Sequence, residues 1–172
     1  MSETMTAPFS KVSFLSSETL AHADETVSEV FAGMLGLTVE AVESAPRPDK
    51  AGPNERTAIV GFSGSLRGSC EIQLTSRAVQ ALASAMMGGA TEEQPDDMLD
   101  DTIGEICNMI GGGWKDRIPA LSSSCTLSPP TVISGSDYKV HLSKPSVRIA
   151  HSYKFGEHLL CLTLHREDAT GD

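Results

Sequence analysis

The chain has 172 residues, of which 40% are apolar and 21% are charged. This composition fits a globular domain, and the length is too short for two domains of full size. Its 13 lysines and arginines against 23 aspartates and glutamates give a formal net charge of −10, so the chain repels phosphate backbones and anionic lipid surfaces. We therefore expect a single domain over residues 1–172, flexible at 1–15 and 167–172, that binds no nucleic acid.

The four cysteines, Cys70, Cys107, Cys125 and Cys161, lie far apart and form no C-x-x-C pair. This spacing fits neither a disulfide framework nor a zinc ribbon, and it is typical of a reducing compartment. The N-terminal segment has no basic stretch followed by an apolar one, and the longest charge-free stretch, residues 118–136, is interrupted by serines and three prolines. We expect a cytoplasmic protein without membrane insertion.

The first half of the chain predicts a helix, a proline-rich loop, a hairpin and a second helix. Apolar residues recur at helical spacing from Ser17 and stop at Gly36, as in an amphipathic helix that ends at a glycine. Thr75 or Ser76 can cap the second helix, which ends at a pair of glycines. The expected strands between the two helices are a short β-rich stretch at 37–43 and a hairpin formed by 57–62 and 68–74.

The second half of the chain predicts a third helix, Asp97 to Arg117, a stretch rich in serine and proline, and further strands. These strands are expected at 131–134, 139–142, 146–153 and 158–165, the last two joined as a hairpin across Phe155 and Gly156.

Helix, proline-rich linker and hairpin occur in this order twice, in 17–74 and in 97–165. An internal structural duplication is one interpretation, although the two halves share little residue identity. Long helices without regular βαβ alternation favour an α+β fold, in which the helices cover a mainly antiparallel sheet.

The third helix has two distinct faces. At about 100° per residue, one broad sector is apolar and is expected to face the core; it holds Leu99, Ile103, Ile106, Cys107, Ile110 and Trp114. The opposite sector holds Asp97, Asp101, Gly104, Glu105, Asn108, Gly111, Gly112 and Lys115. One interpretation of this second sector is a polar face that only meets solvent.

Several glycines and an asparagine on this sector favour a functional interpretation. Each glycine inside a helix costs up to about 1 kcal/mol relative to alanine, and a missing side chain allows another group to approach closely. The amide of Asn108 both donates and accepts hydrogen bonds, so it can orient a water molecule, and the carboxylate of Glu105 one turn away can bind a cation. Alternatively, Gly111 to Gly113 end the helix early and leave Trp114 in a loop.

The segment GEICNMIGGGWK, with E-x-x-N-x-x-x-G on Glu105, Asn108 and Gly112, resembles the active-helix motif of the CheX branch of the CheC/CheX/FliY chemotaxis phosphatases. Residues 63–88 are similar to the family's preceding hairpin and helix, and residues 127–135 to its following segment. The resemblance spans about 57–135 and, more loosely, the final hairpin. It implies a CheC/CheX-like, pseudo-duplicated fold.

The resemblance also implies a function: a hydrolase that removes the phosphoryl group from the aspartate of a phosphorylated CheY-like receiver domain. Glu105 would bind the receiver's active-site lysine, Asn108 would align the attacking water, and Asp101, Gly104 and Gly112 would contact the partner. The receiver brings its own Mg²⁺, so this chain needs no cofactor and no metal, and its contribution is mainly positioning. The first helix lacks a second E-x-x-N motif, which implies one active site per chain.

An alternative of another class remains open. The family includes related proteins of the flagellar switch that bind partners without hydrolysis, so the chain can also be a non-catalytic module of the same fold that binds a receiver or a switch component. The presence of both Glu105 and Asn108 favours the phosphatase.

Other candidate sites are weaker. The five histidines lack metal-ligand spacing, although His151 and His158 can face one another across the final hairpin. The glycine pairs and triplets lack the context of a phosphate-binding loop, and the serines at 122–124 have no recognisable base. Met86 and Met87 are predicted to fill the core.

We further expect a two-fold homodimer. The resemblance implies dimers that form through the sheets, and the apolar strands 131–134 and 139–142 would otherwise leave an open sheet edge. Strands of the C-terminal half would meet across the axis, with both third helices keeping their acidic faces outward.

Overall fold

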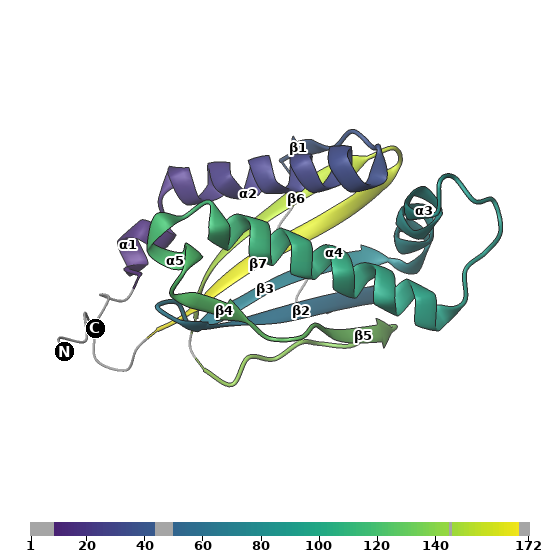
Figure 1. Ribbon diagram of the computed structural model, residues 1–172. Helices are drawn as coiled ribbons and strands as arrows, with labels where there is room; N and C mark the ends of the chain where they lie inside the picture. Colours follow the sequence, from purple (N-terminus) through teal and green to yellow (C-terminus); the bar gives the residue numbers. More distant parts are fainter. Residues whose placement is uncertain (1–8, 44–49, 145, 169–172) are drawn as a thin grey trace.

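The structure, a computed structural model, describes residues 9–43, 50–144 and 146–168, and within these ranges the strands form one antiparallel sheet of seven. Two long helices, α2 (Ser17–Val30) and α4 (Asp96–Asp116), lie side by side across one face of the sheet, and α3 (Ser76–Met86) lies at one end (Figure 1). The predicted α+β class is confirmed.

Both predicted hairpins are present with the expected bounds to within a few residues. The strands are β1 (Glu40–Val42), β2 (Glu55–Gly64), β3 (Gly68–Thr75), β4 (Cys125–Leu127), β5 (Thr131–Gly135), β6 (Ser146–Phe155) and β7 (His158–Glu167). The two short helices are α1 (Lys11–Phe14) and α5 (Pro119–Ser122). Strands β2 and β3 pair antiparallel, as do β6 and β7.

The sheet shows the internal structural duplication that was one interpretation of the sequence. Its order is β1-β6-β7-β3-β2, with β4 and β5 pairing successive parts of β2. Exchanging β1, β2 and β3 with β5, β6 and β7 maps this order onto itself: β1 pairs β6 as β5 pairs β2, and β3 pairs β7 at the centre, where Ile72 lies opposite Leu162. Each half thus supplies one outer strand to the hairpin of the other.

The predicted helix ends are confirmed in detail. After α2 the chain continues as a π-helical turn, Phe31–Leu35, and stops at Gly36, whose φ of 61° places it in the left-handed region that glycine adopts readily. Thr75 is the N-cap of α3, because its side chain accepts a hydrogen bond from the backbone N–H of Ala78 at 3.1 Å.

Two expectations about the chain need correction. Residues 9–15 are not a flexible tail: α1 lies here and its Phe14 is fully buried, while residues 1–8 lie outside the described residues. At the other end, Glu167 is the last residue of β7, and residues 169–172 lie outside the described residues.

Residues 139–142, expected as a strand, form none. The chain turns away from β2 through Gly135 and Asp137, with φ of 150° and 60°. The segment is then held by Tyr138, whose hydroxyl lies 2.8 Å from the Thr57 hydroxyl and whose carbonyl accepts a hydrogen bond from Ala51.

Helix α4 lies very close to the sheet and to α2 because glycine occurs at its contact points. A Cβ added to Gly111 would lie 2.9 Å from Cγ2 of Val60 on β2, and a Cβ added to Gly113 would lie 2.8 Å from Cγ2 of Thr26 on α2. The helix is unbroken here, so the alternative that the glycines end it early is wrong. Trp114 is fully buried within the helix, and its indole N–H donates to the carbonyl of Thr19 at 3.1 Å.

The two neighbouring glycines of α4 give a matched test of this packing. We expect Gly111→Ala to lower the free energy of unfolding by about 1–3 kcal/mol, because the added methyl group overpacks the contact with Val60. Gly112→Ala meets only Cδ2 of Leu127 at 4.0 Å, so its better helix propensity should leave stability unchanged or raise it by up to about 1 kcal/mol. Urea unfolding, monitored by circular dichroism, compares the two variants. Equal urea midpoints for both would contradict the close contact at Gly111.

Candidate functional site

The start of α4 is fixed by a buried arginine on the neighbouring strand. Arg56 of β2 is only 4% exposed, and its guanidinium forms ion pairs with Asp100 and, at 2.6 Å, with Asp96. A guanidinium taken out of water is stable only when it is paired and hydrogen-bonded, so this cation holds the first turn of the helix against β2.

The middle of α4 is held by its apolar face. Ile103, Ile106 and Ile110 are buried, as the sequence predicts. On the same face, the thiol of Cys107 donates to the backbone carbonyl of Ala58 on β2 at 3.4 Å and to that of Cys70 on β3 at 3.5 Å. A hydrogen bond with Cys107, together with burial, raises the pKa of the Cys70 thiol well above its usual range, so this thiol stays protonated and acts as core.

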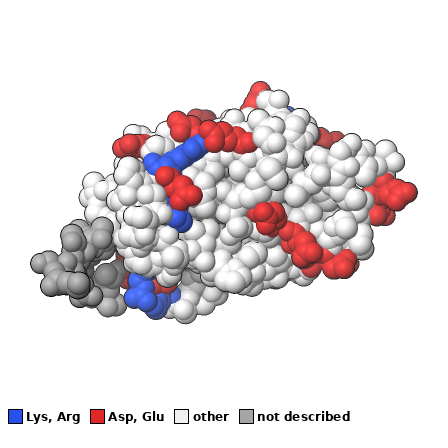
Figure 2. Space-filling model, in the orientation of Figure 1, with Lys and Arg blue, Asp and Glu red and all other residues white. Residues whose placement is uncertain are grey.

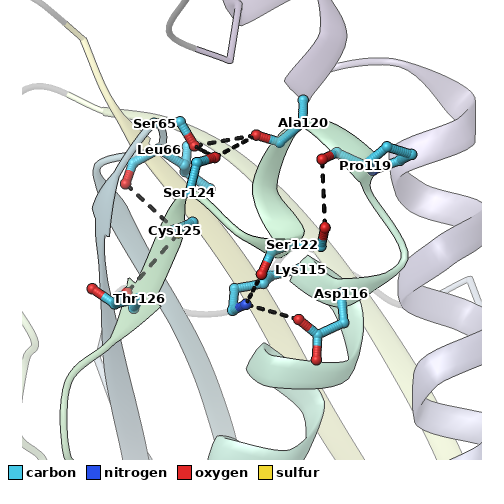
Figure 3. A network of polar contacts seen from close by, with 10 residues as sticks. All are labelled: Ser65, Leu66, Lys115, Asp116, Pro119, Ala120, Ser122, Ser124, Cys125 and Thr126. Carbon is cyan, nitrogen blue, oxygen red and sulfur yellow. Dashed lines mark hydrogen bonds and ion pairs between the residues drawn. The ribbon is translucent and has the colours of Figure 1, made fainter. Parts of the chain in front are cut away.

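The end of α4 is tied to α5 and to the β2–β3 turn by a polar network (Figure 3). The ammonium group of Lys115 donates to the carbonyl of Ser122 at 2.9 Å and pairs with Asp116 at 2.7 Å. The hydroxyls of Ser65 and Ser124 lie 2.6 Å apart, which joins the turn to the segment before β4. Both ends and the middle of α4 are thus anchored independently.

The outward face of α4 presents the residues of the E-x-x-N motif. The side chains of Asp101 and Glu105 are exposed, while Asn108 and Gly112 are half-buried. In the part of the chain that the structure describes, neither Glu105 nor Asn108 has a side-chain hydrogen bond or ion pair. The carboxylate of Glu105 and the side-chain amide of Asn108, one turn apart on a rigid helix, are therefore available to bind a molecule outside the chain.

Two glycines expected on this face lie elsewhere. Gly104 and Gly111 are buried. A Cβ on Gly104 would lie 3.3 Å from Pro130, in the segment before β5, so this glycine lets that segment approach the helix. Its expected exposure is wrong because Pro130 and Val132 of β5 cover this side of the helix.

The outward face is acidic, and Figure 2 shows a row of acidic side chains over the N-terminal half of α4 without a basic side chain beside it. The basic residues of and around this helix already have partners within the chain. Arg56 pairs with Asp96 and Asp100, Lys115 pairs with Asp116, and Arg117 reaches Glu29 of α2 at 2.5 Å. Asp101 and Glu105 have no such partner among the described residues, so this face attracts cations.

A shallow groove of about 610 Å³ lies against this face. Asp101, Glu105 and Gly104 line it together with Met86, Met98, Pro130 and Val132. Met86 and Met87 are 37% and 52% exposed, so the expectation that they fill the core is wrong. Helix α3 ends at Met86, and its buried stripe already stops at Ala83.

A second polar cluster joins α2 to β6. The carboxylate of Asp24 accepts hydrogen bonds from the Tyr153 hydroxyl at 2.7 Å and from the His151 ring at 2.8 Å. Burial and this carboxylate raise the pKa of the Tyr153 hydroxyl. His151 lies opposite Leu162 in the hairpin, so it does not face His158.

In residues 9–43, 50–144 and 146–168, no three histidine, cysteine or acidic side chains come together as ligands for a metal ion. Within the same ranges, no helix is long and apolar enough to cross a membrane. All four cysteines are free thiols.

Sequence reasoning missed Arg56 as an anchor of the site, and one signal for it was present. An arginine at the start of an otherwise apolar strand, with two acidic residues four apart at the start of a later helix, is the pattern of a buried ion pair. Pairing between β2 and α4 depends on the tertiary fold, so the pattern alone does not identify the partners.

Comparison with known proteins gives consistent matches. The sequence profile of the family "Chemotaxis phosphatase CheX" matches residues 56–152, which are 97 of the 172 residues. The CheY-P phosphatase CheX of Thermotoga maritima is 33% identical over 88 residues, which are 51% of this chain and 57% of the relative. The match therefore spans little more than half the length of that relative.

Solved structures share the fold. A chemotaxis protein CheX from Desulfovibrio desulfuricans superposes with a TM-score of 0.74 at 21% identity, covering 87% of this chain and 99% of that one. A chain of the CheX-CheY-BeF3-Mg²⁺ complex from Borrelia burgdorferi gives a TM-score of 0.71 at 20% identity, covering 87% and 98%. Since the family profile covers more than half of the sequence, the chain belongs to the CheX family of chemotaxis phosphatases.

Proposed function

We propose that this chain is a phosphatase that hydrolyses the aspartyl phosphate of a CheY-like receiver domain. The observation that carries the proposal is the pair of Glu105 and Asn108 on the outward face of a rigidly anchored helix, where neither side chain has a partner among the described residues. The names of the relatives support the choice of substrate, because one is a CheY-P phosphatase and another is a complex of CheX with CheY.

Asn108 has the role of placing the attacking water. An aspartyl phosphate is a mixed anhydride, so a water oxygen that attacks phosphorus in line forms the new P–O bond as the bond to the aspartate oxygen breaks, releasing inorganic phosphate, an aspartate and a proton to solvent. The side-chain amide of Asn108 can donate to and accept from that water, which removes much of the entropic barrier to attack.

Glu105 has the role of engaging the receiver. Its carboxylate lies one turn from Asn108 and pairs with the lysine of the receiver's active site, which fixes the angle at which Asn108 enters. Asp101 adds negative charge on one side, and the small Gly112 leaves room on the other. Mg²⁺ belongs to the receiver, where it neutralises the phosphoryl oxygens, and no residue of this chain is asked to hold it.

The first prediction concerns the water. Asn108→Ala and Asn108→Asp are expected to lower the rate of phosphate release from a phosphorylated receiver by about a hundredfold or more, because the water loses its orienting amide. Affinity for the receiver loaded with BeF₃⁻ and Mg²⁺, measured by calorimetry, should change less than about twofold for the alanine variant. Urea unfolding serves as the control for folding. A variant with half of the wild-type rate would contradict this role.

The second prediction concerns the carboxylate. Glu105→Gln should weaken both affinity and turnover, by about tenfold, because the charge-assisted pair with the receiver's lysine exists in the bound complex before the reaction. Glu40→Gln is the matched control, since Glu40 is also exposed but lies on β1, outside the outward face of α4. If Glu105→Gln and Glu40→Gln behave alike, Glu105 has no part in the site.

We also propose that the chain forms a two-fold dimer. The strand expected at 139–142 is absent, so the argument now rests on β5, which pairs with β2 on one side and with no other described strand on the opposite side. An isologous contact between strands of the C-terminal half would close that edge and keep both copies of α4 facing outward.

The dimer predicts a mass and a stoichiometry. Light scattering at micromolar concentration should give about 36 kDa, twice the 18.2 kDa of one chain. Titration with a BeF₃⁻-loaded receiver should give one receiver per chain without cooperativity. A mass near that of one chain would exclude the dimer, and one receiver per two chains would exclude independent sites.

A further inference from the structure

Three exposed methionines gather beside the proposed active face. Large apolar side chains are rarely exposed in the described part of this chain, yet Met86, Met87 and Met98 are 37%, 52% and 38% exposed, at the end of α3 and the start of α4. Met86 and Met98 line the groove that also contains Asp101 and Glu105. Exposed apolar side chains in a groove next to a binding site commonly mark a contact with a partner.

The loop that joins α3 to α4 is tied to α3 by hydrogen bonds, which fix the positions of the methionines relative to one another. The Gln80 side chain accepts a hydrogen bond from the backbone N–H of Gln94 at 3.0 Å, and it also donates to the carbonyl of Glu92. The Ser84 hydroxyl donates to the carbonyl of Ala90. Side chains of α3 thus bind both halves of the loop, which keeps Met86 close to α4 and preorganises the groove.

The groove has two chemical parts. Its apolar walls are Met86, Met98, Pro130 and Val132. Negative charge comes from Asp101 and Glu105, whose carboxylates form no ion pair within the described part of the chain. A matching surface must therefore carry a cation directly next to an apolar side chain. A free anion is repelled by this combination, and a lone metal ion would leave the apolar walls uncovered.

We propose that Met86 and Met98 form a specificity site of the receiver contact, which takes an apolar side chain next to the lysine that pairs with Glu105. The inference rests on the proposed function and adds a determinant of which receiver is bound. A second copy of the chain does not fit this groove, because a two-fold contact through it would bring two acidic rows together.

Methionine suits such a site. Its unbranched thioether adapts to side chains of different shape, so the groove can select for an apolar neighbour of the lysine without requiring one particular residue. Burial of one such side chain contributes enough to change affinity by about tenfold. Neither methionine touches the reacting atoms, so the expected effect is on binding.

The test compares isosteric polar replacements with a remote control. We expect Met86→Gln combined with Met98→Gln to raise KM for the phosphorylated receiver, and Kd for the receiver loaded with BeF₃⁻ and Mg²⁺, by about tenfold with kcat within about twofold. Met98→Leu, which keeps the apolar wall, should behave as wild type. Val12→Gln is the matched control, because Val12 is 83% exposed on α1, outside the groove.

The outcomes separate this inference from the proposed function. If the wild type accelerates dephosphorylation and the double variant matches it in KM and Kd, the specificity site is refuted while the phosphatase stands. If the wild type binds the loaded receiver without accelerating hydrolysis, the phosphatase is refuted, and Kd alone decides on the groove. A fall in kcat at unchanged KM would also refute the specificity site.

Discussion

The close contact between α4 and the sheet is the constraint on which the rest of the structure depends. At Gly111 the helix lies so near to β2 that a single methyl group would collide with Val60. This distance lets the isoleucines of α4 reach the sheet core and lets the thiol of Cys107 reach two backbone carbonyls. It also fixes the rotation of α4 about its own axis, since only one side of the helix can come so close. The direction of Glu105 and Asn108 follows from that rotation.

Charge is divided between the inside and the outside of the same helix. Carboxylates or carbonyls of the chain bind the cations of Arg56, Lys115 and Arg117 near α4, whereas Asp101 and Glu105 face outward without an ion pair among the described residues. Internal ion pairs therefore fix the helix and at the same time set the sign of its exposed face. The phosphatase activity that we propose needs no nucleophile from this chain, because an aspartyl phosphate is already reactive and only the water has to be placed.

Much of this fold could be predicted from the sequence. Helical spacing predicted α2, α3 and α4, glycines marked the ends of α2 and α3, and period-two alternation predicted both hairpins, because these signals depend on neighbours along the chain. The errors occurred where distant segments decide burial. Gly104 looked exposed on a helical projection but lies under Pro130, and Met86 looked buried although 37% of its surface is exposed. Residues 139–142 do not form the expected strand because Asp137 adopts a left-handed conformation that turns the chain away from β2.

The residues of the E-x-x-N motif could be predicted because their spacing on one helix is local. The Arg56 anchor could not, because it joins residues 40 and more positions apart.

The most direct measurement is a crystal structure of this chain bound to a BeF₃⁻-loaded, Mg²⁺-containing receiver. The proposed mechanism predicts that α4 keeps its position on the sheet, that the Asn108 amide lies about 3 Å from a water in line with the beryllium–aspartate bond, and that Glu105 pairs with a receiver lysine. A receiver bound elsewhere on the chain, with the outward face of α4 open to solvent, would contradict it.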